Sequence, residues 1–237
     1  MSLLYTGLAE LYFEMYQKIF DYKKDFEFYN RYLSEFSCRS VLEIGCGTGT
    51  LGKYLIDAGY VYTGLDLYRE MVDIAARENP SGRFFMGDMR DLQLDRTFDS
   101  ALITGRTFAY LVDDRDVNNT LAGIYKILND NGKLIFDCFD TDSIFGNFKE
   151  YSEHKFELND KTVTRIDRLN RITETGSTWD WDATYIVEEG GKKREYIDKS
   201  TLRAFDQNEL KQFLKLNDFR ILEVINDKIL VVIAEKQ

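Results

Sequence analysis

The stretch from Val41 to Tyr54 (VLEIGCGTGTLGKY) constrains the fold of this chain more than any other part of it. Val41 to Ile44 is a short apolar run with one acid, which is typical of a buried parallel strand. Three glycines follow at every second position from Gly45, and such a turn lets backbone N–H groups approach a ligand without Cβ atoms in the way. Apolar residues recur at helical spacing from Leu51. The stretch therefore predicts a strand, a glycine turn and a helix whose N-terminus faces a ligand.

Strands and helices are predicted to alternate along the next part of the chain. The predicted strands are Tyr60–Leu67, Arg83–Met86, Phe98–Thr104 and Leu134–Phe139, and the predicted helices are Glu70–Glu78 and Asp116–Leu128. This alternation indicates an α/β fold with a doubly wound, mainly parallel, seven-stranded Rossmann-like sheet. Ligands bind such sheets beyond the carboxyl ends of the strands. Asn129 to Gly132 ends the second helix, and we expect Gly132 to take the left-handed conformation after it.

The pattern changes after Thr141. Three stretches alternate apolar and polar residues or carry β-branched and aromatic ones, which predicts an inserted antiparallel sheet: Val163–Arg171, Trp179–Glu188 and Lys193–Arg203. Asp206 and Glu209 have the spacing of a capping box at the start of a helix. Two closing strands, Phe219–Ile225 and Ile229–Ala234, complete the core. We therefore divide the chain into a core, residues 1–150 and 204–237, and an insert, residues 151–203.

The first part of the core, about residues 1–36, is predicted to be helical. Leu8 to Leu33 is unusually rich in aromatic residues, a feature that is typical of packing. The functional interpretation is a lid that folds over the ligand cleft.

Composition excludes several classes of function. The net charge is −10 with acids and bases mixed along the chain, which argues against a nucleic-acid partner. No apolar run approaches 18 residues, so we expect no membrane span. The first eight residues lack the features of a signal peptide, and the three cysteines form no C-x-x-C pair, so we expect a cytoplasmic protein with free thiols. The single histidine, His154, and the lack of a ligand cluster argue against a metal site.

The glycine turn and the acid before it resemble motif I of the class I S-adenosylmethionine (SAM) methyltransferases, hydrophobic-hydrophobic-Glu/Asp-hydrophobic-Gly-x-Gly-x-Gly. The alternative is the dinucleotide-binding motif G-x-G-x-x-G. The last position of this motif requires a small residue, where this chain has Thr50, and the motif assigns no role to Glu43. Within class I, the chain most resembles small-molecule N-methyltransferases that act on amino sugars. That likeness rests on Leu11–Tyr16, on the Gly-Asp-Met-Arg-Asp motif at Gly87–Asp91, on Tyr110–Leu111 and on the inserted sheet.

The resemblance implies SAM as cofactor and a role for each matching residue. Asp66 would accept hydrogen bonds from the two ribose hydroxyls, and Asp88 with Met89 would meet the adenine. The alternatives are an N-cap for Asp66 and a turn acid for Asp88. Thr104 would lie near the sulfonium. The full set of implied cofactor-binding residues is Tyr16, Tyr22, Glu43, Gly45, Cys46, Gly47, Asp66, Leu67, Asp88, Met89 and Thr104.

The methyl acceptor is expected to be a small soluble molecule, methylated on nitrogen or oxygen. The predicted substrate-binding residues are Arg106, Tyr110, Trp179 and Trp181, and we expect Arg165, Arg168 and Tyr185 on the same face of the insert. A guanidinium would bind an anionic group of the acceptor, such as a phosphate or carboxylate. The alternative is that Arg106 pairs with Asp113 or Asp114 and that the tryptophans pack in the core. No catalytic base is assigned, and a monomer or a homodimer is expected. A SAM-binding protein without methyl transfer is the alternative function.

Overall fold

The computed structural model describes residues 2–173, 176–227 and 229–237. The core contains β1 (Ser40–Ile44), β2 (Val61–Asp66), β3 (Arg83–Met86), β4 (Phe98–Ile103), β5 (Leu128–Asp140), β10 (Phe219–Asp227) and β11 (Ile229–Lys236). Its helices are α1 (Ala9–Ile19), α2 (Tyr22–Glu35), α3 (Thr50–Asp57), α4 (Arg69–Glu78), α5 (Asp114–Ile127) and α7 (Gln207–Leu216). A short 3₁₀ helix, η1 (Thr107–Tyr110), and α6 (Thr141–Phe145) were not predicted from the sequence.

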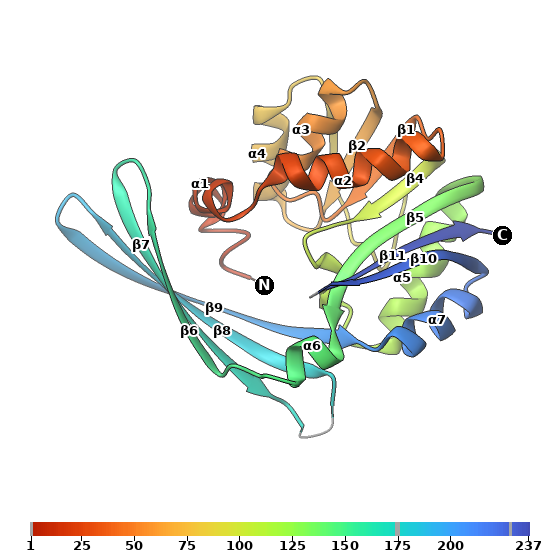
Figure 1. Cartoon of the computed structure of the whole chain (residues 1–237). Helices are drawn as coiled ribbons and strands as arrows, with labels where there is room; N and C mark the ends of the chain where they lie inside the picture. The colour runs from red at the N-terminus through yellow and green to blue at the C-terminus, as the bar shows by residue number, and fades with distance from the viewer. Residues whose placement is uncertain (1, 174–175, 228) are drawn as a thin grey trace.

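The core sheet has the predicted doubly wound arrangement. Its strands follow the order β3-β2-β1-β4-β5, all pairing in parallel, and β11 and β10 continue the sheet in antiparallel orientation beyond β5. Helices cover both faces of these strands (Figure 1). Because β1 lies in the middle of this sheet, four of its five residues are buried, as the apolar run around Val41 predicts. The predicted fold is confirmed.

Four antiparallel strands form the insert: β6 (Tyr151–Glu157), β7 (Lys161–Arg171), β8 (Thr178–Glu189) and β9 (Lys192–Phe205). The last residues of β9 pair in parallel with the end of β5, through Phe139 with Ala204 and Asp140 with Phe205. The insert therefore extends the core sheet and projects from it as a long curved arm (Figure 1). Strand β6 lies at the edge of this sheet and is largely exposed, so its sequence lacks the apolar alternation by which the other three strands were predicted.

The predicted helix from Leu8 to Leu33 is two helices instead of one. Helix α1 ends at Ile19, and α2 starts after Asp21, whose carboxylate accepts the backbone N–H of Lys24. An Asp side chain satisfies the free N–H groups of a helix start, and this local bond competes with continuation of the first helix. The break leaves α1 and α2 free to pack on different parts of the molecule.

Helix α1 lies between the core and the insert (Figure 1). Its buried Leu11 and Met15 pack in one apolar cluster with Val163 and Tyr185 of the insert. Ala9, on the opposite side, packs with apolar residues of α4. Helix α2 instead packs on α3. The N-terminal segment thus connects two parts of the molecule that are far apart in the sequence.

Two predictions at helix ends had opposite outcomes. Asp206 accepts the backbone N–H groups of Asn208 and Glu209, and the Glu209 carboxylate accepts the Asp206 N–H, so the capping box before α7 is confirmed. Helix α5 ends at Ile127 and passes into an extended Leu128, so the expectation that Gly132 is its left-handed cap is wrong. The residue with positive φ is Asn131, at 59° within β5, and Asn tolerates this conformation better than most residues do.

Candidate functional site

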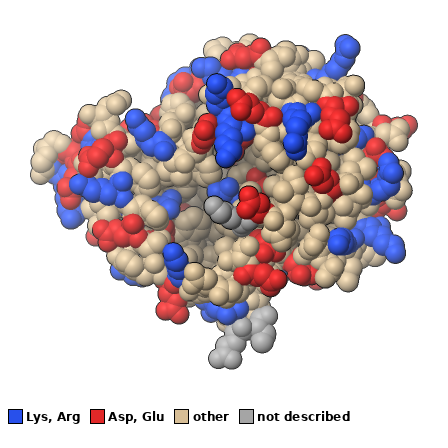
Figure 2. Space-filling view, viewed as in Figure 1, with Lys and Arg blue, Asp and Glu red and all other residues tan. Residues whose placement is uncertain are grey.

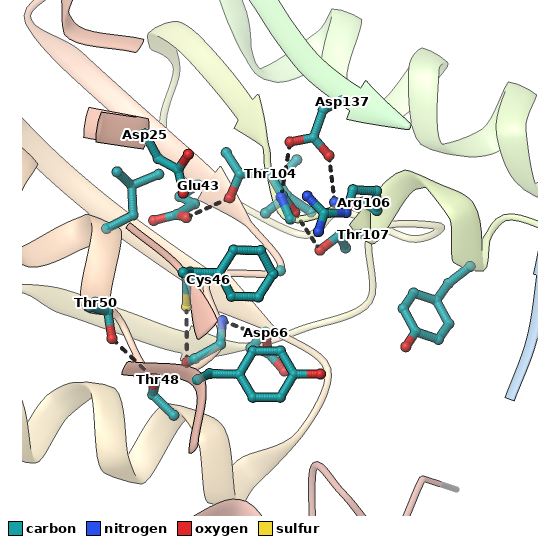
Figure 3. A pocket seen from close by; sticks show the side chains of 18 of the residues that line it. Asp25, Glu43, Cys46, Thr48, Thr50, Asp66, Thr104, Arg106, Thr107 and Asp137 are labelled. Carbon is teal, nitrogen blue, oxygen red and sulfur yellow. Dashed lines mark hydrogen bonds between the residues drawn. The ribbon is translucent and has the colours of Figure 1, made fainter. Parts of the chain in front are cut away.

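A cavity of about 720 Å³ lies at the carboxyl ends of the core strands. Core strands, α1, α2 and the insert all contribute side chains to its wall. Its volume is typical of sites for small ligands and cofactors. Acidic and basic side chains are interspersed over the face of the molecule drawn in Figure 2. Figure 3 shows the polar groups that converge inside the cavity.

Every residue that the sequence assigned to the cofactor lines this one cavity. These residues are Tyr16, Tyr22, Glu43, Gly45, Cys46, Gly47, Asp66, Leu67, Asp88, Met89 and Thr104. They come from α1, α2, the ends of β1, β2 and β4, and the segment after β3. The structure therefore brings together residues that are up to 88 positions apart in the chain, from Tyr16 to Thr104.

The glycine turn after β1 adopts a backbone that other residues rarely take. Gly45, Gly47 and Gly49 all have positive φ, between 52° and 73°. A Cβ atom at Gly45 would collide with the side chain of Thr107, so the turn also lies closely against the loop after β4. Helix α3 starts directly after Gly49, at Thr50. The N–H groups of the first turn of α3 have no partner within the helix, and they favour negative charge and hydrogen-bond acceptors at this end of the cavity.

Asp66, at the end of β2, supports the glycine turn. One oxygen accepts the backbone N–H of Gly47 at 2.9 Å, and the other accepts that of Tyr68 at 3.0 Å. Burial raises the pKa of this carboxyl, while these two backbone donors act to lower it. The N-cap position of α4 belongs to Tyr68, so Asp66 is not the predicted alternative cap. Because a carboxylate has about four acceptor positions, Asp66 retains capacity for a ligand.

Glu43 is fully buried in β1 and holds Thr104. The Tyr62 hydroxyl donates to one Glu43 oxygen at 2.6 Å, and Thr104 Oγ1 donates to the other at 3.0 Å. Burial raises the pKa of Glu43 to about 7, although both donors act to lower it. Since each oxygen already has a protein donor, the role of Glu43 is to position Thr104, just after β4, in the cavity wall (Figure 3).

Asp88 forms an ion pair that the sequence did not predict. Arg90 donates through its guanidinium to both Asp88 oxygens, the shortest bond being 2.6 Å, and through its backbone N–H at 2.9 Å. Arg90 thereby holds the pKa of Asp88 below its ordinary value. Arg90 lines the cavity and also approaches Asp116 at 3.4 Å. The bond from the Arg90 backbone is one that a turn acid makes, which was the alternative role for Asp88, and the guanidinium of Arg90 favours the ionised carboxylate.

Arg106 lies on the opposite side of the cavity, in the loop after β4. Its guanidinium carbon is 5.1 Å from the centre of the Phe20 ring, and it forms no ion pair with a carboxylate in the part of the chain that the structure describes. The expected alternative pairing with Asp113 or Asp114 is wrong, because Arg203 pairs with Asp114 at 2.8 Å. Arg106 therefore presents its guanidinium to the cavity without a direct ion pair, although its charge acts to lower the pKa of the nearby Asp137 and Asp25 carboxyls.

The residues predicted for the acceptor divide into two groups. Tyr110 and Trp181 line the cavity together with Arg106 and Arg165. Trp179 does not: it is buried against Phe139 and Phe145, with ring centres 5.3 Å and 5.9 Å away.

Arg168 and Tyr185, which were expected on the same face of the insert as the tryptophans, also lie outside the cavity wall. Arg168 is exposed, because it stands an odd number of positions from Arg165 and so points to the other face of β7. Tyr185 is buried under the N-terminal segment.

Comparisons with known proteins identify the type of domain. Residues 41–132 match the family described as "Methyltransferase domain". This chain carries a methyltransferase domain. The matching residues run from β1, before the glycine turn, to the end of α5. The methyltransferase class predicted from the sequence is confirmed.

Curated relatives and solved structures agree with this assignment. A Geobacillus sp. (strain WCH70) protein, provisionally named a methyltransferase, is 27% identical over 80% of this chain and 77% of its own length. A dTDP-3-amino-3,6-dideoxy-alpha-D-glucopyranose N,N-dimethyltransferase of Streptomyces fradiae is 33% identical over 35% of this chain and 32% of its own.

Two solved structures cover nearly all of the chain and share its fold. One is a SAM-dependent methyltransferase from Clostridium acetobutylicum ATCC 824, with 18% identity, 98% coverage of both chains and a TM-score of 0.84. The other is the sugar N-methyltransferase KedS8 from Streptoalloteichus sp. ATCC 53650, with 21% identity, 96% and 92% coverage and a TM-score of 0.83.

Sequence analysis missed several residues that line the methyltransferase cavity. Asp137, in β5, is buried and accepts hydrogen bonds from Tyr29 at 3.0 Å and from the backbone of the loop that carries Arg106. An acid within an otherwise apolar predicted strand was the available signal. Tyr5 and Tyr12 also line the cavity, and the Tyr5 hydroxyl lies 2.6 Å from that of Tyr110. Their signal was the aromatic surplus of the N-terminal segment.

Two other kinds of feature are absent from the described ranges. No group of three or more His, Cys, Asp or Glu side chains there is arranged to hold a metal ion. No helix in those ranges is both long and apolar enough to cross a membrane.

Proposed function

We propose that this chain transfers the methyl group of S-adenosylmethionine to an amine nitrogen of a small soluble molecule. The observation that carries the proposal is the convergence of all eleven expected cofactor residues on one cavity, at the glycine turn of a methyltransferase domain. The choice of nitrogen is supported by the sugar N-methyltransferase with the same fold and by the aminosugar dimethyltransferase among the relatives.

The residues present fit the cofactor. Gly45 to Gly47 line the cavity just before α3, and their N–H groups donate to the Leu65 carbonyl and to Asp66, so the end of β2 holds the turn in place for the methionine part. Asp66 retains acceptor positions for a ribose diol, and Asp88 with Met89 stands beyond it for the adenine amine. Thr104, held by Glu43, would lie nearest the sulfur. When bound, the cofactor supplies a methyl carbon already activated by its positive sulfonium.

The chain's task in the reaction is positioning. In the transfer, the acceptor nitrogen would use its lone pair to form a bond to the methyl carbon as the carbon–sulfur bond breaks in line behind it. Holding the reacting atoms about 3–3.5 Å apart accounts for much of the acceleration in such displacements. No catalytic base is assigned, because an amine that arrives neutral needs none before the transfer.

For the acceptor, we propose a molecule with an anionic group bound by Arg106. The support is the Arg106 guanidinium, which forms no direct ion pair among the described residues and faces a cavity wall of aromatic side chains. A planar guanidinium can bond two oxygens of a phosphate or carboxylate at once. The nucleotide part of the dTDP-aminosugar in the name of one relative is an anionic group of this kind.

We also propose that the insert covers the acceptor and that the N-terminal segment acts as a lid. Arg165 and Trp181 of the insert line the cavity from one side, and Tyr5, Tyr12 and Tyr16 line it from the segment. Tyr12 and Tyr16 stack with ring centres 3.9 Å apart, so the segment presents a continuous aromatic surface.

The three cysteines are unpaired and buried, in keeping with a reducing compartment such as the cytoplasm.

The rival function is a protein that binds SAM without methyl transfer. Binding alone does not separate the two functions, since both require the same cavity. Formation of S-adenosylhomocysteine (SAH) that depends on an added amine separates them, because only an enzyme consumes SAM in response to an acceptor.

A further inference from the structure

Asp25 is an acidic residue of the cavity wall for which the proposed function has no role so far. It lies in the first turns of α2, one helical turn after Tyr22, and both residues line the cavity. The side chain is half-buried, and its carboxylate accepts no hydrogen bond from the residues that the structure describes. The carboxylate points into the cavity near Glu43 (Figure 3). An ionised group in such a place is costly unless a positive partner arrives.

The neighbouring acids have hydrogen-bond partners, whereas Asp25 has none within residues 2–173, 176–227 and 229–237. Glu43 accepts from Tyr62 and Thr104, and Asp137 accepts from Tyr29 and from two backbone N–H groups. The nearby charge of Asp137 adds to burial in raising the pKa of Asp25, and the positive charges of Arg106 and Lys24 only partly oppose this rise. The geometry therefore leaves one carboxylate that faces the cavity without a matching donor.

The position of Asp25 selects one cationic group of the cofactor, and this step rests on the proposed function. Asp66 and Asp88 would hold the ribose and adenine at the ends of β2 and beyond β3. The methionine chain must then extend the other way, across Gly45 to Gly47, toward the ends of β1 and β4. Asp25 lies at that side, next to Glu43 of β1 (Figure 3). The negative charges of Asp25 and Glu43 both act to raise the pKa of the Tyr22 and Tyr29 hydroxyls.

We propose that the Asp25 carboxylate binds the α-ammonium group of the cofactor's methionine part. An ammonium offers three N–H donors and a full positive charge. It therefore supplies the kind of partner that the described part of the protein does not give this carboxylate. The contact joins α2 to the cofactor directly. Binding of the cofactor therefore compensates a charge that the N-terminal segment carries into the cavity, and the segment is held closed by the same contact.

Three adenosine compounds test this assignment by isothermal titration. SAM has both the sulfonium and the α-ammonium, SAH has the α-ammonium alone, and 5′-methylthioadenosine has neither. Asp25→Asn keeps the shape of the side chain and removes its charge. We expect this substitution to weaken the binding of SAM and SAH roughly ten- to a hundred-fold and to leave the affinity for 5′-methylthioadenosine nearly unchanged.

Glu27→Gln is the matched control, because Glu27 is exposed on the same helix and does not line the cavity. It should leave all three affinities unchanged. The proposal is overturned if Asp25→Asn leaves SAH binding intact, if it weakens SAM alone, which would indicate the sulfonium, or if it weakens 5′-methylthioadenosine equally. An effect confined to the KM of the acceptor would overturn it too. Failure of the unmodified chain to bind SAM would instead contradict the proposed function.

Discussion

The buried carboxylate of Asp137 accepts the backbone N–H of Arg106, a residue with φ of 64°. The N–H of Gly105, at φ of 65°, donates to the other carboxylate oxygen at 3.1 Å. Two successive left-handed residues are costly when the second is not glycine. Asp137 offsets this cost and fixes the loop that presents Arg106 to the cavity. Strand β5 therefore controls the proposed acceptor side of the cavity, whereas β1 and β2 form the proposed cofactor side.

Replacement of Arg106 tests the anionic acceptor. Arg106→Ala should raise the KM for the acceptor about ten- to a hundred-fold and leave the SAM dissociation constant nearly unchanged, because a charge-assisted contact contributes roughly 1.5–3 kcal/mol. Initial rates at saturating SAM give the first quantity, and isothermal titration gives the second. Arg115→Ala is the control, since that side chain is 83% exposed. Loss of SAM binding with an intact acceptor KM would place Arg106 at the cofactor.

Asp66→Ala should weaken the binding of both SAM and SAH about five- to a hundred-fold. The variant leaves two ribose hydroxyls and the Gly47 N–H without their acceptor, a cost of roughly 1–3 kcal/mol. Isothermal titration measures the change, with Asp91→Ala as the control because Asp91 is exposed and bonds Gln93. Unchanged affinity in the Asp66 variant would remove this carboxylate from the ribose site.

Amide exchange tests the lid. Exchange in α1 and α2 should slow when SAM is added, because the ligand would fix the aromatic wall that these helices contribute. The break at Phe20 and Asp21 should show the largest difference, since the two helices pack on separate parts of the molecule. Equal exchange with and without SAM would make the segment an ordinary packing element.

Glu43 should make stability depend on pH in a defined direction. Burial raises its folded pKa to about 7, above the unfolded value, so the folded state binds more protons between roughly pH 4.5 and 7. The contribution is thus fully present below that window and is lost as pH rises through it, by at most about 1.4 kcal/mol per pH unit. Denaturant titrations across this range should show a shallower decline in Glu43→Gln. Parallel curves for the two proteins would show that Glu43 does not titrate there.

The sequence predicted the parts of this molecule that local patterns determine. The strand and glycine turn around Gly45, the core sheet and the capping box at Asp206 follow from periodicity and turn chemistry, and the structure contains all of them. The acid at Asp66 was found in the same way, because it ends a predicted strand beside the turn.

Other features depend on three-dimensional packing that no local pattern encodes. Trp179 and Trp181 lie on the same face of β8, yet only Trp181 reaches the cavity, since α6 and the end of β5 cover Trp179. The pairing of Asp137 with the loop at Arg106 joins positions 31 apart in the chain. The break between α1 and α2 was marked only by Asp21, a weak signal within an otherwise helical pattern.

Acceptor-dependent formation of SAH is the measurement that tests the central claim most directly. The purified chain is incubated with SAM and a panel of amines that includes nucleotide-linked aminosugars, with uncharged amines and hydroxyl compounds for comparison. We expect SAH to accumulate with an anionic amine, together with a product heavier by one methyl group, and to remain at background without acceptor or with Asp66→Ala. Tight SAM binding with no SAH formed from any acceptor would contradict the claim and favour a SAM-binding protein without methyl transfer.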